Sequence, residues 1–379
     1  MRVFDFNRDL TDTRVVLRAS LNVPVSAGEV GDTFRIHETL KTIEMLAERG
    51  ARTVMLAHIG RDPETSLRSV WEELKKHTKR TIHFIPQVVG EEVDEAIQTL
   101  AAGEVLLLEN VRSIPGEKEN DPAVAKQLAT YGEVFINDAF ADSHRAHASI
   151  VGIPQYVPSF IGPQFIREYE HIMPARTPLS PSLAIVGGAK FETKVPLVRY
   201  LLDAYDHVYI AGALANDFFA AQGYAVGDSL VSGAQYAQEF LGHKKILLPS
   251  DVVVTNGKES RVCALTDVHT DERIIDVGPT SSADLAPYID SAAFIVWNGP
   301  LGNVEAGFGD ATKAVAQYIA KASGTSVVGG GDTAAAIRDL ELFDQFSFVS
   351  TAGGAMLELV ARGTLVGLEA VNQSGPMPL

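Results

Sequence analysis

The stretch Leu183-Ala184-Ile185-Val186-Gly187-Gly188-Ala189-Lys190 decides how this chain is expected to fold. Four successive apolar residues predict a short buried strand, and the paired glycines predict a tight turn at its end. Glycine has no Cβ, so its backbone N–H groups can come close to a ligand. Where such a turn opens a helix, the partial positive charge at the helix N-terminus creates a site for an anion.

Five further glycine-bearing turns follow apolar, strand-like runs in the second half of the chain. They are Ala211-Gly212-Ala213, Gly278-Pro279, Gly299-Pro300-Leu301-Gly302, Gly329-Gly330-Gly331-Asp332-Thr333 and Ala352-Gly353-Gly354. Helical patterns such as Val195–Ala204 and Thr312–Ala322 separate the runs. This alternation predicts an α/β fold with a parallel sheet and helices on both of its faces. Several glycine turns along one sheet edge indicate a large phosphorylated ligand.

The first half has the same alternation but different residues at the strand ends. Its strand-like runs, which predict a second parallel sheet, are Arg14–Leu17, Thr53–Ala57, Val105–Leu108 and Val134–Ile136. Arg, His, Asn and Asp follow these runs, where ligands bind in such sheets. The candidates are Arg18, Asn22, Arg35, His58, Arg61, Asn110, Arg112, Asn137, Asp138, His144, Arg145 and His147.

Converging arginines would hold a small substrate with two anionic groups, because each guanidinium binds carboxylate or phosphate through two parallel N–H groups. Any single arginine could instead pair with a nearby Asp or Glu, and His144 and His147 could simply hold their loop. The whole set at equivalent strand ends favours a binding site. Two anion sites of different kinds suggest transfer of a group between two ligands.

The composition of the chain restricts its number of domains and the kinds of partner that it can bind. The chain has 379 residues, which predicts about two domains, and its 46% apolar content is enough for two cores. A formal net charge of −16 disfavours nucleic acid or an anionic membrane as the main partner. No apolar run reaches the ~18 residues of a membrane-spanning helix. The single cysteine, Cys263, fits a reducing cytoplasm and is expected to be a small buried strand residue rather than a nucleophile. The charged segment Met1–Leu10 shows no signal peptide.

Lys190 and Lys194 are expected to share a helix face just after the Gly187-Gly188 turn, where two cations suit a bound phosphate. Asp332 could hold Mg²⁺, which usually takes one or two carboxylates together with phosphate oxygens, or it could only cap a helix. Glu305 could accept hydrogen bonds from a ribose or be a surface charge. The sequence contains neither a dinucleotide-type glycine fingerprint nor a Walker-type phosphate loop.

The domain boundary is expected near Pro158–Ser182, a proline-rich stretch that contains the helical piece Gln164–Ile172. A helix flanked by prolines would suit a hinge, although an ordinary surface loop with a helix in it has the same pattern.

Together, these motifs and their order resemble the phosphoglycerate kinase family over essentially the whole chain. The matching segments are Leu21-Asn22-Val23-Pro24, Ala57-His58-Ile59-Gly60-Arg61, Leu108-Glu109-Asn110-Val111-Arg112, Asn137-Asp138-Ala139-Phe140, His144-Arg145-Ala146-His147, Gly187-Gly188-Ala189-Lys190, Trp297-Asn298-Gly299-Pro300, Gly329-Gly330-Gly331-Asp332 and Ser350-Thr351-Ala352-Gly353-Gly354. The resemblance implies two Rossmann-like lobes joined by a helical hinge. It implies a phosphoglycerate-binding lobe over 1–165, a hinge over 166–181, a nucleotide-binding lobe over 182–364 and a segment 365–379 that returns to the first lobe.

The resemblance also implies a reversible reaction in which 1,3-bisphosphoglycerate and ADP give 3-phosphoglycerate and ATP, with Mg²⁺ as cofactor, in a cytoplasmic monomer. The residues implied for the phosphoglycerate are Ser20, Asn22, Arg35, His58, Arg61, Arg112 and Arg145. Those implied for the nucleotide are Gly188, Lys190, Lys194, Gly212, Pro300, Glu305, Gly331, Asp332 and Thr333, with Asp332 serving the metal. Those implied for the transfer itself are Arg35, Lys190, Lys194, Gly353 and Gly354.

The chain departs from the family pattern at a few positions. Ser20 stands where the family usually has an aspartate that contacts the substrate, so weaker substrate binding is expected. Asp62-Pro63-Glu64 replaces the usual Pro-Lys-Gly, and Ala211, Ala213 and Ala352 replace glycines. These changes leave two alternatives open: a related acyl-phosphate kinase with another small carboxylate substrate, and a non-catalytic nucleotide-binding relative. Retention of both lysines disfavours the second.

Overall fold

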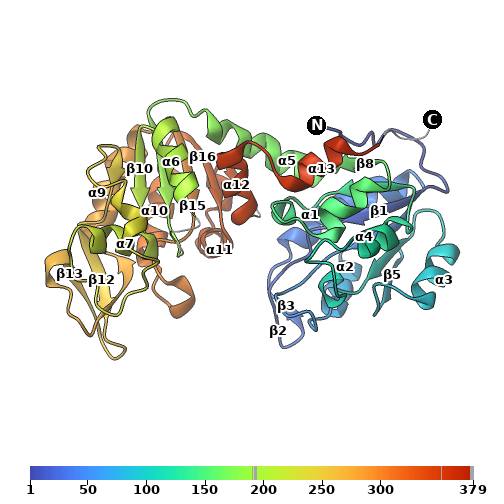
Figure 1. Cartoon of the computed structure of the whole chain (residues 1–379), viewed down its shortest axis with the longest axis horizontal. Coiled ribbons are helices and arrows are strands. Elements are labelled where there is room, and N and C mark those ends of the chain that lie inside the picture. The colour runs from blue at the N-terminus through green and yellow to red at the C-terminus, as the bar shows by residue number, and fades with distance from the viewer. Residues whose placement is uncertain (190, 192–193, 351, 376–379) are drawn as a thin grey trace. The chain divides into compact units, whose positions relative to one another are not determined.

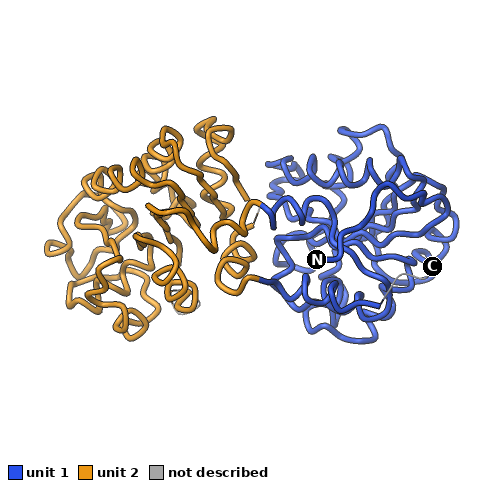
Figure 2. The backbone as a smooth tube through the Cα atoms, turned by 90° about the horizontal axis from the view of Figure 1, so that it is seen from above, with its two compact units in different colours: residues 1–170, 364–379 blue, residues 171–363 orange. Residues whose placement is uncertain are grey.

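The computed structural model describes residues 1–189, 191, 194–350 and 352–375. The chain divides into two compact units, residues 1–170 with 364–379 and residues 171–363 (Figures 1 and 2). The α/β class with two parallel sheets is confirmed. The chain passes from unit 1 to unit 2 inside helix α5 (Pro163–Ile172) and returns after Gly363.

Unit 1 is built on a six-stranded parallel sheet in the order β5-β6-β4-β1-β7-β8. Its strands are β1 (Arg14–Arg18), β4 (Arg52–Leu56), β5 (Ile82–Ile85), β6 (Val105–Leu108), β7 (Val134–Asn137) and β8 (Ser159–Ile161). Its helices besides α5 are α1 (Phe34–Glu48), α2 (Arg68–Lys76), α3 (Glu91–Thr99), α4 (Pro122–Ala129) and α13 (Val366–Gln373). A short hairpin, β2 (Val25–Ser26) and β3 (Glu29–Val30), follows β1.

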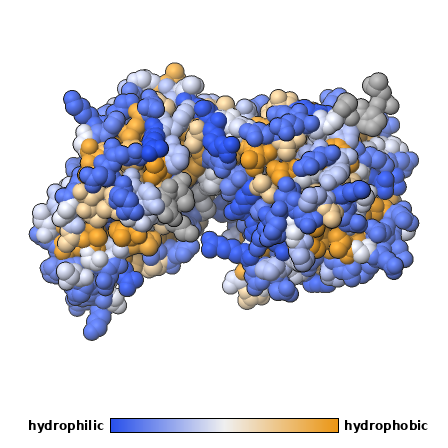
Figure 3. All heavy atoms as spheres, in the orientation of Figure 1, coloured by the Kyte–Doolittle hydropathy of each residue, from blue (hydrophilic) through white to orange (hydrophobic). Residues whose placement is uncertain are grey.

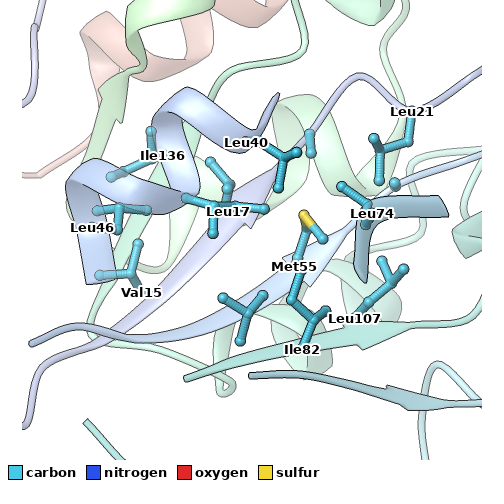
Figure 4. Close-up of a cluster of buried hydrophobic side chains, with 14 of the residues drawn as sticks. Val15, Leu17, Leu21, Leu40, Leu46, Met55, Leu74, Ile82, Leu107 and Ile136 are labelled. Carbon is cyan, nitrogen blue, oxygen red and sulfur yellow. The ribbon is translucent and has the colours of Figure 1, made fainter. Parts of the chain in front are cut away.

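Alternate residues of each strand enter different cores, because successive side chains point to opposite faces of a sheet. Leu17 and Met55 pack with α1 and α2 on one face, in the cluster drawn in Figure 4. Val16 and Leu56 pack on the other face with residues of α3 and α4. The helices therefore cover both faces, as the alternation of strands and helices predicts.

Unit 2 is built on a second parallel sheet, in the order β11-β10-β9-β15-β16-β17. Its strands are β9 (Ser182–Val186), β10 (His207–Ile210), β11 (Ile246–Leu247), β15 (Phe294–Asn298), β16 (Thr325–Gly329) and β17 (Phe348–Val349). Its helices are α6 (Val195–Ala204), α7 (Ala213–Ala221), α8 (Gln235–Gln238), α9 (Pro279–Ser291), α10 (Asp310–Lys321), α11 (Gly331–Asp339) and α12 (Gly354–Arg362). Numbered within the unit, the order is 3-2-1-4-5-6, that of doubly wound nucleotide-binding sheets.

The predicted strands of unit 2 are confirmed, with one difference at an end: the run Phe346–Val349 forms a strand only from Phe348. Unit 2 also contains a three-stranded antiparallel sheet that was not predicted, made of β12 (Asp251–Thr255), β13 (Ser260–Ala264) and β14 (Arg273–Val277). Cys263 is a buried residue of β13, as expected, and burial raises the pKa of its thiol.

The described part of the chain contains no helix that is both long and apolar enough to cross a bilayer. On the face drawn in Figure 3, polar side chains cover most of each unit and apolar side chains appear in small separate areas.

Candidate active site

The predicted residues of unit 1 gather where its strands end. β1 lies between β4 and β7 in the sheet, and Arg18 is its last residue. His58 follows β4, and Asp142 follows β7 in the short 3₁₀ turn Phe140–Asp142. Parallel strands bring their carboxyl ends to one sheet edge, so residues far apart in the sequence meet there.

Asp142 stands at the centre of this group. Its carboxylate lies 3.3 Å from Nδ1 of His58, 3.5 Å from Nη2 of Arg18 and 3.7 Å from Nη1 of Arg145. Burial alone would raise the pKa of the Asp142 carboxyl, but His58 and Arg18 hold it well below its usual range. Burial lowers the pKa of His58 despite the opposing effect of Asp142. Asp142 is therefore an ionised carboxylate, and the guanidinium groups of Arg18 and Arg145 balance its charge.

A second set of predicted residues is joined through the backbone of Gly60. Its N–H donates to Oδ1 of Asn22 at 2.8 Å, and its carbonyl accepts from Nη1 of Arg112. The carbonyl of Asn22 in turn accepts from Nη1 of Arg35 at 2.9 Å. Arg61 follows Gly60 and is exposed. The loop after β4 thus connects the three predicted residues Asn22, Arg35 and Arg112.

The cations of this site repel one another. Burial lowers the pKa of Arg112, and the positive charges of Arg145 and Arg18 lower it further. Burial, Arg112, Arg18 and Arg145 together lower the pKa of His147 to about 4. Mutual repulsion of this kind is relieved when an anion binds, so the cluster suits a small anionic substrate.

Two buried residues beside Arg18, Glu117 and Ser149, were not predicted from the sequence. Glu117 is fully buried and accepts from the backbone N–H of Ser149 at 2.9 Å and from its hydroxyl at 2.6 Å. The same hydroxyl accepts from Nε of Arg18 at 3.0 Å. Nδ1 of His147 lies 3.8 Å from Glu117, which supports the reading that this histidine helps to hold its loop. No local pattern in the sequence indicates that Glu117 and Ser149 meet.

In unit 2, the glycine turns meet where the strand order reverses between β9 and β15. The N–H of Gly187 donates to the carbonyl of Asn298 at 2.9 Å, and that of Gly188 donates to the carbonyl of Pro300 at 3.1 Å. Gly212 has a φ of +61°, and a Cβ there would lie 2.8 Å from the nitrogen of Gly188. Gly187 and Gly212 are therefore required by the close approach of neighbouring strand ends.

A pocket of about 780 Å³ opens at this point. Five of the predicted nucleotide-binding residues line it: Gly188, Gly212, Pro300, Glu305 and Asp332. Its apolar wall was not predicted and includes Phe219, Leu230, Val231, Val252 and Ile275. Leu230 and Val231 are 61% and 41% exposed, so part of this wall would gain burial from a flat apolar ligand.

The other predicted residues of unit 2 surround the turns beside the pocket. Nζ of Lys194 donates to the carbonyl of Gly187 at 2.6 Å, and burial lowers its pKa to about 8. Gly353 precedes α12, and its carbonyl accepts from Nδ2 of Asn298 at 3.3 Å. Gly354 and Gly331 are the first residues of α12 and α11, whose N-terminal N–H groups suit an anion. Lys190 lies outside the described residues.

Asp332 and its neighbours fit a magnesium ion that is bound together with phosphate. Burial and, to a lesser extent, the charge of Glu305 raise the pKa of Asp332, and both residues line the pocket. The hydroxyl of Thr333 is buried and makes no hydrogen bond with the described residues. One carboxylate together with phosphate oxygens is a ligand set that Mg²⁺ commonly takes, so Asp332 at the start of α11 fits this role.

Comparison with known proteins agrees with this geometry. The sequence model of the phosphoglycerate kinase family matches residues 5–362. A phosphoglycerate kinase of Maricaulis maris is 40% identical over 385 residues, covering 96% of each chain. One of Zymomonas mobilis is 41% identical over 394 residues, covering 98% of this chain and 99% of its own.

Solved structures show the same similarity. The phosphoglycerate kinase of Coxiella burnetii, 37% identical, superposes with a TM-score of 0.78 and covers 97% of this chain and 98% of its own. That of Pyrococcus horikoshii, 27% identical, superposes with a TM-score of 0.85 and covers 97% of each chain. Fold and full-length sequence similarity agree, and the chain belongs to the phosphoglycerate kinase family.

Proposed function

We propose that this chain catalyses the reversible, Mg²⁺-dependent transfer of a phosphoryl group from 1,3-bisphosphoglycerate to ADP, giving 3-phosphoglycerate and ATP. One observation supports the proposal: the described residues of the two units gather groups that suit anions, and these groups differ in kind between the units. Unit 1 offers arginine and histidine side chains around Asp142, which suit a small, highly charged substrate. Unit 2 offers glycine turns beside an apolar pocket, which suit a nucleotide.

In unit 1, the proposed ligand of the arginine cluster is the phosphoglycerate. Arg35, Arg112 and Arg145 would bind its charged ends, since guanidinium groups match carboxylate and phosphate oxygens. His58 lies beside Asp142 with its Nε2 buried and without a hydrogen bond to the described residues, so this atom is available to a ligand. Asn22 keeps Arg35 oriented through its carbonyl.

In unit 2, the proposed ligand of the pocket is ATP or ADP. The apolar wall would hold the base, Glu305 the ribose, and Asp332 would hold Mg²⁺ at the phosphates. Bound Mg²⁺ neutralises charge on the phosphate oxygens during the transfer. Lys194 and the N–H groups of Gly353 and Gly354 would stabilise the group in flight, because phosphoryl transfer depends on positioning and charge rather than on acid–base chemistry.

Transfer requires both ligands to lie in line, and each site belongs to one unit. We therefore propose that the two connections between the units, within α5 and after Gly363, allow the units to close during the reaction. Because one chain carries both sites, we also propose that it works as a monomer. A cytoplasmic location is proposed as well, and the single cysteine is compatible with it.

The experiment is a coupled assay of the purified protein with 3-phosphoglycerate, ATP and Mg²⁺, in which bisphosphoglycerate formation consumes NADH. We expect turnover that is lost in Lys190→Ala and in Lys194→Ala. Binding of ATP without turnover of 3-phosphoglycerate would refute the proposal.

The same assay with a panel of other small carboxylates addresses the two alternatives. Full-length similarity to phosphoglycerate kinases does not favour either an altered substrate or a non-catalytic role. We expect 3-phosphoglycerate to be the best substrate of the panel.

A further inference from the structure

The short segment 230–233 joins the wall of the nucleotide pocket to a residue next to the lysines of the site. Leu230 and Val231 line the pocket, and Ser232 follows them directly. The hydroxyl of Ser232 accepts from the backbone N–H of Phe191 at 2.8 Å. Ser232 belongs to none of the segments that carry the family resemblance, so the resemblance gives this contact no role.

Phe191 is buried and supports Lys194. Its side chain is fully buried and packs against two other phenylalanine rings. Its carbonyl accepts from the backbone N–H of Lys194 at 2.8 Å, and in the sequence it follows Lys190 directly. A buried backbone N–H needs an acceptor, and the hydroxyl of Ser232 is the acceptor for Phe191.

Helix α7 holds the segment 230–233 by bonds that do not involve the Ser232 hydroxyl. Nδ2 of Asn216 donates to the carbonyl of Leu230 at 3.0 Å. Oδ1 of Asp217 accepts from the backbone N–H of Ser232 at 2.9 Å and from that of the next residue at 2.7 Å. Removing the hydroxyl alone should therefore leave the wall of the pocket in place.

We propose that Ser232 is a positioning residue for the phosphoryl transfer, because its hydroxyl fixes the backbone of Phe191, which lies between Lys190 and Lys194 in the chain. This inference rests on the proposed function. Nζ of Lys194 donates to the carbonyl of Gly187 at 2.6 Å, so its ammonium group reaches the glycine turn only while its own backbone is held. Phosphoryl transfer depends on such positioning, and a small displacement of a group that takes part in it lowers the rate strongly.

The test is steady-state kinetics of Ser232→Ala in the coupled assay. We expect kcat to fall about tenfold, because a buried backbone N–H loses its acceptor and the lysine beside it is displaced. The KM for ATP should stay within about threefold of the wild type, since α7 still holds the pocket wall. The KM for 3-phosphoglycerate should not change, since its proposed site lies in unit 1. Ser232→Thr keeps a hydroxyl and should restore kcat.

Ser347 provides the matched control in the same unit. Its hydroxyl also accepts from one backbone N–H, that of Ser326, at 3.1 Å. Ser326 is the second residue of β16, so this contact lies near the start of that strand, whereas the glycine turns follow the strand ends. Ser347→Ala should therefore lower the stability of unit 2 at most, and it should leave kcat and both KM values unchanged.

The possible results separate this inference from the proposed function. Turnover by the wild type together with an unchanged kcat in Ser232→Ala would support the function and overturn the role of Ser232. The role would also be overturned if Ser232→Thr were as slow as Ser232→Ala, or if Ser347→Ala lost as much activity. A wild type that does not turn over 3-phosphoglycerate overturns both.

A second variant keeps the test decisive if thermal melting shows that Ser232→Ala does not fold. Ser232→Cys keeps an acceptor at the same position, but its sulfur accepts hydrogen bonds only weakly. A lowered kcat in this folded variant, with the KM for ATP unchanged, supports the role of Ser232, and the kcat of the wild type overturns it.

Discussion

Replacing Gly212 with alanine tests whether the nucleotide pocket depends on the close contact of strand ends. Gly212 has a φ of +61° and a ψ of −155°, a combination that glycine adopts almost alone and that costs an L-residue roughly 1–3 kcal/mol. The added Cβ would lie 2.8 Å from the nitrogen of Gly188 and 3.1 Å from the carbonyl oxygen of Pro300. Both neighbours are backbone atoms and must shift, which costs about 1–3 kcal/mol more. We therefore expect the variant to lose about 2–6 kcal/mol of folding free energy in unit 2.

The same helix offers a matched control. Gly223 follows the other end of α7 and also has a positive φ, +87°, but a Cβ there would meet nothing within 4 Å. Gly223→Ala should therefore lower the free energy of unfolding only by the backbone strain of roughly 1–2 kcal/mol, and it should leave the pocket unchanged.

Chemical unfolding and steady-state kinetics of the two variants test whether the contact between the strand ends shapes the pocket. Gly188 and Pro300 both line the pocket, so displacing them should raise the KM for ATP by about tenfold or more in Gly212→Ala. The KM for 3-phosphoglycerate should stay the same, since unit 1 is not touched. If Gly212→Ala and Gly223→Ala behave alike in stability and in the KM for ATP, the contact between the strand ends does not shape the pocket and the reasoning is refuted.

Three further predictions concern charged groups. Because burial lowers the pKa of Lys194 to about 8, kcat/KM for ATP should fall above about pH 8, and Lys194→Arg should move this fall to higher pH; an unmoved pH profile would assign it to another group. Burial raises the pKa of Asp138 from 3.8 to about 6, so the native state binds the proton more tightly than the unfolded state and loses stability as pH rises through this window. Asp138→Asn should therefore be more stable than the wild type by up to about 3 kcal/mol at pH 8, with no gain at pH 4, in urea unfolding; equal gains at both pH values would contradict this cause. Asp332→Asn should raise the Mg²⁺ concentration for half-maximal activity about tenfold without changing the KM for 3-phosphoglycerate, and an unchanged Mg²⁺ titration would remove Asp332 from the metal site.

The elements that carry a local pattern could be predicted from the sequence. The run Leu183–Val186 is apolar throughout because β9 lies in the middle of its sheet and is buried on both faces. A Cβ at Gly187 would lie 2.2 Å from the carbonyl oxygen of Pro300, and Gly188 has a φ of +91°, so both positions after the strand favour glycine. A signal was also available for the hairpin of β12 and β13, since Asn256-Gly257 stands between two runs with β-branched residues, but the sequence analysis did not use it.

What could not be predicted depends on contacts between distant residues. Asp142 and Arg18 are brought together because β1 and β7 are neighbours in the sheet. Neither residue belongs to a local motif that predicts this contact. Glu117 and Ser149 meet for the same kind of reason. The contact of the Asp142 carboxylate with Arg18 became visible only in three dimensions.

The division of the chain has a consequence for its synthesis. Unit 1 takes its last helix, α13, from residues that follow the whole of unit 2, and the side chain of Arg2 bonds to Ser374. A ribosome therefore finishes unit 2 before it has made all of unit 1. Until α13 is made, the surface that it covers, formed by β8 and residues 148–155, stays exposed. Unit 2, although it is made later, is the first of the two that can reach its final form.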